Sequence, residues 1–255
     1  MLKVTVLGSG TSQGVPVISC KCKVCTSENI KDNRLRASVL IETANKTIVI
    51  DAGPDFRQQM LRENVCDIDA ILVTHEHRDH VSGLDDIRPY NFLNKKSIDI
   101  YAEERVLEAI KSEFHYSFGD KKYPGVPKIN LNNITSKENF YVGDIQIIPI
   151  RAYHYKLPVL GYRIGNFTYL TDINYIPEEE KVKIVGSQYI IIDALRKTKH
   201  ISHFSLHEAV EIIKEFSPKR AYLTHISHQM GLHDEVNKEL PQNVSLAYDG
   251  LKFDC

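Results

Sequence analysis

The sequence predicts an α/β fold in which a single domain, residues 1–255, forms a four-layer αβ/βα sandwich. Short apolar runs rich in Val, Ile and Tyr recur along the chain, as expected of buried strands, and helical patterns lie between some of them. Residues 71–75 and 221–225 are both apolar and both end in Thr-His, which indicates two similar halves that each deliver a histidine from a strand end. The predicted strands are residues 4–7, 38–42, 47–51, 70–74, 98–102, 145–151, 162–164, 167–172, 189–193, 221–224 and 244–249.

Helices are predicted where apolar side chains repeat at helical spacing or where capping residues occur. Ser205 and Glu208 have the spacing of a capping box at the start of one such segment. The least regular stretch is 115–137, and a loop of that length in a compact domain is expected to be a lid or a binding loop. The predicted helices are residues 54–64, 103–114, 209–216 and 232–240.

The composition limits the classes of function. The chain has 32 Lys and Arg against 33 Asp and Glu, and a net charge of −1 argues against a surface built to bind nucleic acid. The first residues lack the apolar run of a secretory signal, and no run of about 18 apolar residues occurs, so we expect a cytoplasmic protein that does not bind membranes. Five cysteines, an odd number, fit reduced thiols better than a disulfide framework.

The densest group of candidate ligands is the segment 75–80, His-Glu-His-Arg-Asp-His, directly after an apolar strand. In extended backbone His75 and His77 point to one side, and a turn after residue 78 can bring Asp79 and His80 to face them. Neutral imidazole and carboxylate groups bind zinc, manganese or iron. Four such residues within six positions exceed the share of one metal, so they predict two adjacent metals rather than a solvated polar loop.

The pattern His-x-His-x-Asp-His after a strand resembles that of the metallo-β-lactamase-fold hydrolases, and further residues follow the family's order along the chain. Asp51, at the end of a predicted strand, matches the family's aspartate below the metal site. The remaining matches also lie where predicted strands run into loops. The resemblance implies that His75, His77 and His154 hold one metal, that Asp79, His80 and His225 hold the other, and that Asp172 bridges both.

The aspartate at position 172 indicates the chemistry, because members of the fold that cleave β-lactams often have a cysteine there. Two metals bridged by a carboxylate and a hydroxide suit in-line attack on a phosphorus ester, with the bridging hydroxide as the nucleophile. The resemblance therefore implies a phosphoric diester hydrolase.

A second candidate site is the segment 20–25, in which Cys20, Cys22 and Cys25 place three thiols on one short loop. Zinc takes four ligands in a tetrahedron, so a distant residue must complete the site. Lys21 and Lys23 favour the thiolate forms that zinc binds.

Within the same fold, a Cys-x-Cys-x-x-Cys loop near the N-terminus resembles the PhnP-type phosphodiesterases of phosphonate breakdown, and this resemblance runs along nearly the whole chain. It implies that His228 completes a structural zinc site and that the protein is a homodimer. It also implies that His203 acts with Asp79 in catalysis, by holding the scissile phosphate or by protonating the leaving oxygen. Three histidines compete with His203 and are expected in solvent, namely His200, His207 and His233.

Together these features predict a metal-dependent phosphodiesterase that acts on a small, cyclic phosphodiester of a sugar or nucleotide. The expected cofactors are two divalent ions, Mn or Zn, in the active site and one structural Zn. Three alternatives stay open: a tRNA 3′-end processing endoribonuclease, a quinone-cofactor biosynthesis protein of the same fold, and a zinc-stabilised binding protein. The lack of a basic run argues against the first, and the complete ligand set argues against the last.

Overall fold

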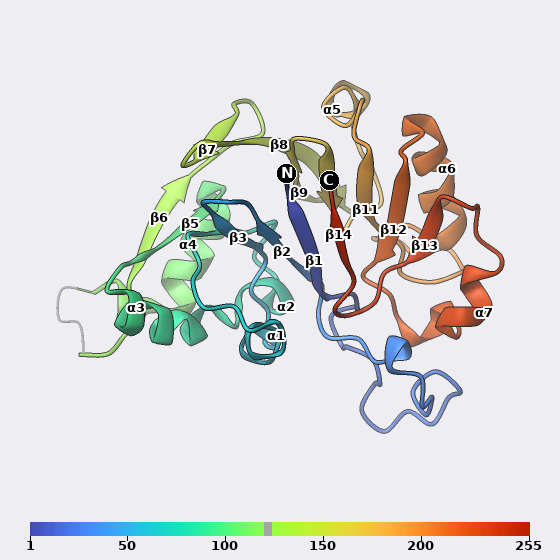
Figure 1. The fold of residues 1–255 in the computed structure, drawn as a ribbon, viewed down its shortest axis with the longest axis horizontal. Coiled ribbons are helices and arrows are strands. Elements are labelled where there is room, and N and C mark those ends of the chain that lie inside the picture. Colours follow the sequence, from blue (N-terminus) through green and yellow to red (C-terminus); the bar gives the residue numbers. More distant parts are fainter. Residues whose placement is uncertain (120–123) are drawn as a thin grey trace.

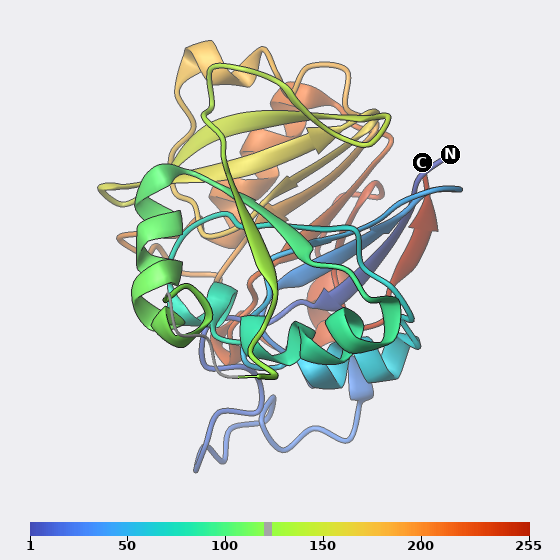
Figure 2. The ribbon, with the colours of Figure 1, turned by 90° about the vertical axis from the view of Figure 1, so that its left-hand side faces the viewer.

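The computed structural model describes residues 1–119 and 124–255 (Figure 1). The strands of these residues form two seven-stranded mixed sheets, and apolar side chains pack between the sheets and beneath the helices on each outer face. Figure 2 shows the two sheets one above the other, with helices on the outer sides. The predicted four-layer αβ/βα sandwich is therefore confirmed.

The first sheet has the order β14-β1-β2-β3-β4-β5-β6. Its pairings are antiparallel from β14 to β3 and parallel from β3 to β6. Because β3, β4 and β5 are parallel, their carboxyl ends lie at one edge, where polar loops can converge. The strands are β1 (Lys3–Gly8), β2 (Ser38–Glu42), β3 (Thr47–Ile50), β4 (Ala70–Leu72), β5 (Ile98–Ala102), β6 (Ile129–Asn133) and β14 (Lys252–Asp254).

The second sheet has the order β13-β12-β11-β10-β9-β8-β7. Its strands are antiparallel from β7 to β10 and parallel from β10 to β13, which again gathers several carboxyl ends at one edge. The strands are β7 (Phe140–Val142), β8 (Ile145–His154), β9 (Leu157–Ile164), β10 (Phe167–Leu170), β11 (Tyr189–Asp193), β12 (Arg220–Thr224) and β13 (Val244–Leu246).

The helices cover the outer faces of the sheets and bury one apolar side each. The predicted capping box is confirmed at α6, where the Ser205 hydroxyl accepts a hydrogen bond from the Glu208 backbone and Glu208 Oε2 accepts one from the Ser205 backbone. The α-helices are α1 (Phe56–Glu63), α2 (Arg78–Val81), α3 (Arg88–Asn94), α4 (Glu104–Glu113), α5 (Glu178–Lys181), α6 (Leu206–Phe216) and α7 (His233–Asn237). None of the helices in the described residues is long and apolar enough to cross a bilayer.

Two expectations about local structure need correction. The stretch 115–137 is not wholly a loop: it contains a 3₁₀ turn (His115–Ser117) and β6, while residues 120–123 lie outside the described part of the chain. Ile129 and Leu131 of β6 pack against the apolar core beneath the helices of the first sheet. The three asparagines of β6 make the segment too polar to be recognised as a strand from its sequence. His233, which was expected in solvent, is only 3% exposed.

Candidate active site

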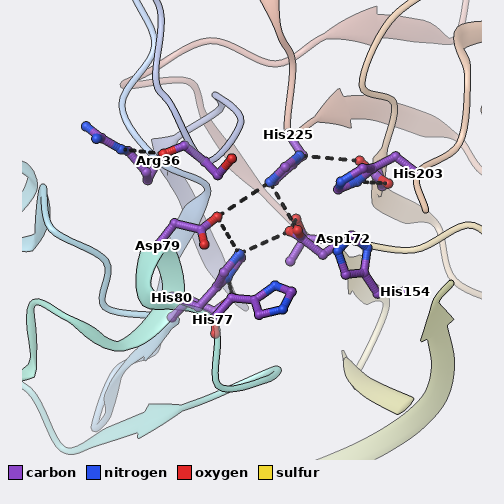
Figure 3. Close-up of polar contacts among 12 residues, drawn as sticks. Arg36, His77, Asp79, His80, His154, Asp172, His203 and His225 are labelled. Atoms are coloured by element: carbon purple, nitrogen blue, oxygen red, sulfur yellow. Dashed lines mark hydrogen bonds and ion pairs between the residues drawn. The ribbon is translucent and has the colours of Figure 1, made fainter. Parts of the chain in front are cut away.

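The predicted metal ligands lie where strands of the two sheets end, so both halves of the sandwich contribute to one site (Figure 3). Three residues that lie within two positions after a strand end, Asp51, Asp172 and His225, have φ angles of 63°, 53° and 57°. This left-handed region is uncommon for residues other than glycine. Such strained backbone occurs often at functional sites, where the surrounding fold holds it in place.

Asp79, His80, Asp172 and His225 form the tightest group, with one ligand atom from each lying within 4.8 Å of the others. His80 Nε2 lies 3.1 Å from both Asp79 Oδ2 and Asp172 Oδ2, and His225 Nε2 lies 3.2 Å from Asp172 Oδ1. Figure 3 shows both imidazoles pointing at the two carboxylates. Among the described residues, neither of these buried Nε2 atoms has a partner in hydrogen-bond geometry, although carboxylate oxygens lie close by. This donor set fits a divalent metal, because a cation would satisfy the two ring nitrogens and both carboxylates.

The other predicted ligand set, His75, His77 and His154, is less closely assembled. His75 Nε2 and His77 Nδ1 lie 3.0 Å apart, and the rings of His77 and His154 have centroids separated by 5.3 Å. In the described residues His154 instead shares a group of ligand atoms with Asp172 and His203. The three histidines therefore face one region, and their assignment to a single metal stays a prediction.

Burial and neighbouring charges shift the pKa values of these residues, and the direction differs from one residue to another. Burial lowers the pKa of His75 and of His154, which keeps both imidazoles neutral. Burial alone would raise the pKa of Asp172, but the nearby His225 and His80 outweigh it and hold the pKa well below its usual value. His75 and His154 therefore offer neutral nitrogen donors and Asp172 an ionised carboxylate. At His80, burial opposes protonation, but Asp172 and Asp51 raise its pKa well above the usual value.

Asp51 lies beneath the cluster, as its position in the sequence predicted, and is fully buried. Its carboxylate accepts hydrogen bonds from the Thr74 backbone at 2.8 Å, from the Thr74 hydroxyl at 2.9 Å and from His80 Nδ1 at 2.8 Å. A carboxylate bound to the far nitrogen of a ligand histidine fixes the tautomer and orientation of that ring.

Asp193 is a site residue that the sequence analysis missed. Asp193 is the last residue of β11, and its Oδ2 accepts a hydrogen bond from His203 Nδ1 at 3.0 Å. The His203 ring stacks on His225 with a centroid distance of 4.7 Å and lies 4.5 Å from His154. Burial would lower the pKa of His203, but Asp193 raises it to about 9. The available signal was an aspartate ending an apolar strand, as Asp51 and Asp172 do.

Two glycines allow the loop that carries Asp79 to pack against the loop after β3. A Cβ on Gly53 would lie 2.0 Å from the Asp79 carbonyl oxygen, and one on Gly83 would lie 2.0 Å from the Gly53 carbonyl oxygen. The Ala52 backbone also donates a hydrogen bond to the His80 carbonyl at 2.8 Å. The position of Asp79 therefore depends on close backbone contact that larger residues would prevent.

The cysteine segment and His228 form a second group, as predicted, with all four ligand atoms within 4.8 Å of one another. His228 Nδ1 lies 3.3 Å from the sulfurs of Cys20 and Cys22 and 3.5 Å from that of Cys25. The Cys25 backbone N–H lowers the pKa of Cys22 to about 6, whereas burial raises that of Cys25 to about 11. Three sulfurs and one imidazole are the donor set of a tetrahedral structural zinc site.

A model of the beta-lactamase superfamily domain matches residues 46–226, and the chain therefore belongs to this superfamily. With this fold and its candidate metal sites, it is a metal-dependent hydrolase of the metallo-β-lactamase fold. A crystal structure of a new diphosphatase from the PhnP family superposes with a TM-score of 0.93 at 39% identity, covering 99% of this chain and 96% of that one. The resemblance to PhnP-type enzymes is thereby confirmed.

Two further proteins define the range of relatives. Zinc-bound PqqB from Methylobacterium extorquens has a TM-score of 0.80 at 18% identity, covering 99% of this chain and all of that one, which shows a shared fold. An octanoyltransferase from Porphyromonas gingivalis is 41% identical over 253 residues, 98% of this chain but 51% of that protein. The chain spans about half the length of this curated relative, so the name of the whole relative does not identify the activity of the matching half.

Proposed function

We propose that the chain is a metal-dependent phosphodiesterase that hydrolyses a small, cyclic phosphodiester of a sugar or nucleotide. The observation that carries this proposal is the group of Asp79, His80, Asp172 and His225, in which two buried imidazole nitrogens face two carboxylates. Beside this group lies His203, which its contact with Asp193 keeps protonated at neutral pH. A cation-binding group next to a proton donor is the arrangement that hydrolysis of a phosphorus ester needs.

The predicted metal ligands would form two sets, one for each ion. His75, His77 and His154 would hold one Mn or Zn ion, Asp79, His80 and His225 would hold the other, and Asp172 would contact both. When bound, these ions would lower the pKa of water, so that it can act as a nucleophile near neutral pH, and would neutralise charge on the phosphoryl oxygens.

His203 would protonate the leaving oxygen. Its Nδ1 donates a hydrogen bond to Asp193, so Nε2–H is the group that would donate its proton to the substrate. The carboxylate of Asp193 stabilises the imidazolium until the proton is transferred.

The structural zinc is proposed at Cys20, Cys22, Cys25 and His228. His228 lies three residues after His225, so this zinc would brace the loop that carries a catalytic ligand. We also propose that residues 1–255 act as one domain and that the protein is a cytoplasmic homodimer. Light scattering of the purified protein tests the homodimer.

A second candidate substrate is a molecule with a phosphoanhydride bond. The similar structure from the PhnP family is that of a diphosphatase, which favours this candidate. Each phosphorus of a diphosphate diester carries two substituted oxygens, one ester and one anhydride, where a phosphodiester carries two esters, so the same cluster suits both.

A turnover screen of the metal-loaded protein tests the proposal. It compares cyclic ribose phosphates, cyclic nucleotides, a dinucleoside diphosphate and a precursor tRNA. We expect hydrolysis of a cyclic phosphodiester, abolished in His203→Ala and retained in His207→Ala, whose imidazole is exposed on α6. Preferred cleavage of the diphosphate would support the second candidate, and cleavage of the tRNA alone would contradict both.

A further inference from the structure

A cleft of about 590 Å³ opens beside the histidine cluster. Two predicted metal ligands, His77 and His154, line it, so the cleft is continuous with the candidate active site. Its other walls are the turn between β8 and β9 and the loop that precedes His203. A volume of this size suits a small ligand. The lining residues outside the metal cluster are Tyr155, Lys156, Leu157, Ile201 and Ser202.

The walls of this cleft are unusually apolar for a surface next to a charged site. Tyr155 and Ile201 are 51% and 65% exposed, and Leu157 is partly buried. One exposed apolar residue has no special meaning, but several that line one cleft indicate a ligand surface. Apolar walls do not contribute to binding the scissile phosphate, so they must serve another part of the substrate.

One side chain fixes the positions of both walls. Asn174 Oδ1 accepts a hydrogen bond from the Tyr155 backbone at 2.7 Å, and Asn174 Nδ2 donates one to the Ile201 carbonyl at 3.0 Å. Asn174 itself lies two residues after Asp172. Tyr155 has a φ of 58°, a strained conformation that this contact helps to hold. The cleft is therefore preorganised relative to the metal cluster, which lowers the entropic cost of binding.

The charge of the cleft indicates the kind of ligand. Lys156 Nζ lies 5.4 Å from the centroid of the Tyr155 ring, so an ammonium group stands beside an aromatic face. An aromatic ring and aliphatic side chains suit a planar apolar group, and the ammonium suits an adjacent anionic oxygen. A nucleobase joined through its sugar to a phosphate has both features.

We propose that this cleft binds the nucleobase of a nucleotide-type phosphodiester, on the nucleoside that stays joined to the phosphorus after hydrolysis. The base packs against Tyr155 and Ile201, and Lys156 contacts an anionic oxygen. This inference rests on the proposed function, because it takes the scissile phosphate to lie at the histidine and aspartate cluster.

The test uses two substrates with the same leaving group: thymidine 5′-(p-nitrophenyl phosphate), which carries a nucleoside, and methyl p-nitrophenyl phosphate, which does not. Stacking of a base on an aromatic side chain contributes about 1–3 kcal/mol. Tyr155→Ala should therefore raise KM about fivefold or more for the thymidine ester, change it less than about twofold for the methyl ester, and leave kcat similar for both. Tyr155→Phe should restore the wild-type KM. Tyr141→Ala, which removes a tyrosine of similar exposure from β7, is the matched control.

Equal effects of Tyr155→Ala on the two esters, or no effect on either, would overturn the inference. If the wild-type protein hydrolyses neither ester, the turnover screen with cyclic phosphodiesters decides the proposed function, and calorimetric binding of thymidine 5′-monophosphate decides the inference separately. Tighter binding by the wild-type protein than by Tyr155→Ala would support the cleft as a nucleobase site, and equal binding would overturn it.

Discussion

His80 Nδ1 donates a hydrogen bond of 2.8 Å to Asp51 Oδ2, and both side chains are fully buried. Asp51 is itself held by two hydrogen bonds from Thr74, so the His80 ring cannot turn freely. Its Nε2 is consequently directed at Asp79 and Asp172. The loop after β3 thus sets the orientation of a side chain in the metal cluster without belonging to that cluster.

Asp51→Asn should weaken metal binding and activity about 10–100-fold, because the amide cannot accept and hold the His80 N–H as the carboxylate does. The measurement is kcat/KM for bis(p-nitrophenyl) phosphate at several metal concentrations. Asp144→Asn, at an exposed aspartate, is the matched control. An Asp51→Asn protein with wild-type kcat/KM and metal affinity would show that the contact has no orienting role.

Gly53→Ala should displace Asp79, because the new Cβ would lie 2.0 Å from the Asp79 carbonyl oxygen. We expect at least a tenfold loss of metal affinity by titration. Gly119→Ala is the matched control, since among the described residues the atom nearest its Cβ would be the His115 carbonyl oxygen, at 3.9 Å. Equal metal affinity in the two variants would argue against the packing constraint.

The activity should fall as the pH rises through the pKa of His203, because only the protonated imidazole can donate a proton. Burial opposes protonation, but Asp193 raises this pKa to about 9. Asp193→Asn removes the charge that stabilises the imidazolium, so the alkaline limb of the kcat profile should move to lower pH. An alkaline limb that stays in place in Asp193→Asn would exclude His203 as the group that titrates.

The free energy of unfolding should decrease as the pH falls from about 6.5 to 4, because His233 is buried with a lowered pKa. Burial and the charges of Arg34 and Lys31 lower its pKa to about 4, and its Nδ1 accepts a hydrogen bond from Arg34 Nη2 at 3.1 Å. The unfolded chain binds a proton near pH 6.5, so it binds more protons than the folded state in this window. The contribution of His233 is therefore complete above pH 6.5 and is lost as the pH approaches 4.

His233→Gln keeps an acceptor for Arg34 but cannot titrate. The melting temperature of this variant should fall less steeply than that of the wild-type protein between pH 6.5 and 4. Parallel pH dependences of the two melting temperatures would contradict the assignment.

Most of the sheet framework could be predicted because its strands are buried on both faces and therefore form continuous apolar runs. The predicted segments 38–42 and 98–102 coincide with β2 and β5. β6 and β14 were missed because they are edge strands that carry polar residues, and β7 was missed because it is only three residues long. Their position depends on the neighbouring strand rather than on their own sequence.

The candidate site was predictable where the ligands are close in sequence, as in segments 75–80 and 20–25. Asp193 and Tyr155 could not be assigned in this way, because each acts through contacts that only the folded chain creates. Gly53 also gave no local signal, since its role is to admit the Asp79 backbone from another loop.

The central claim is that the chain holds a two-metal centre and a separate structural zinc, and the metal content of the purified protein tests it most directly. Elemental analysis should give about three metals per chain, falling to about two in Cys22→Ser. A wild-type content of one metal per chain or fewer would contradict the account.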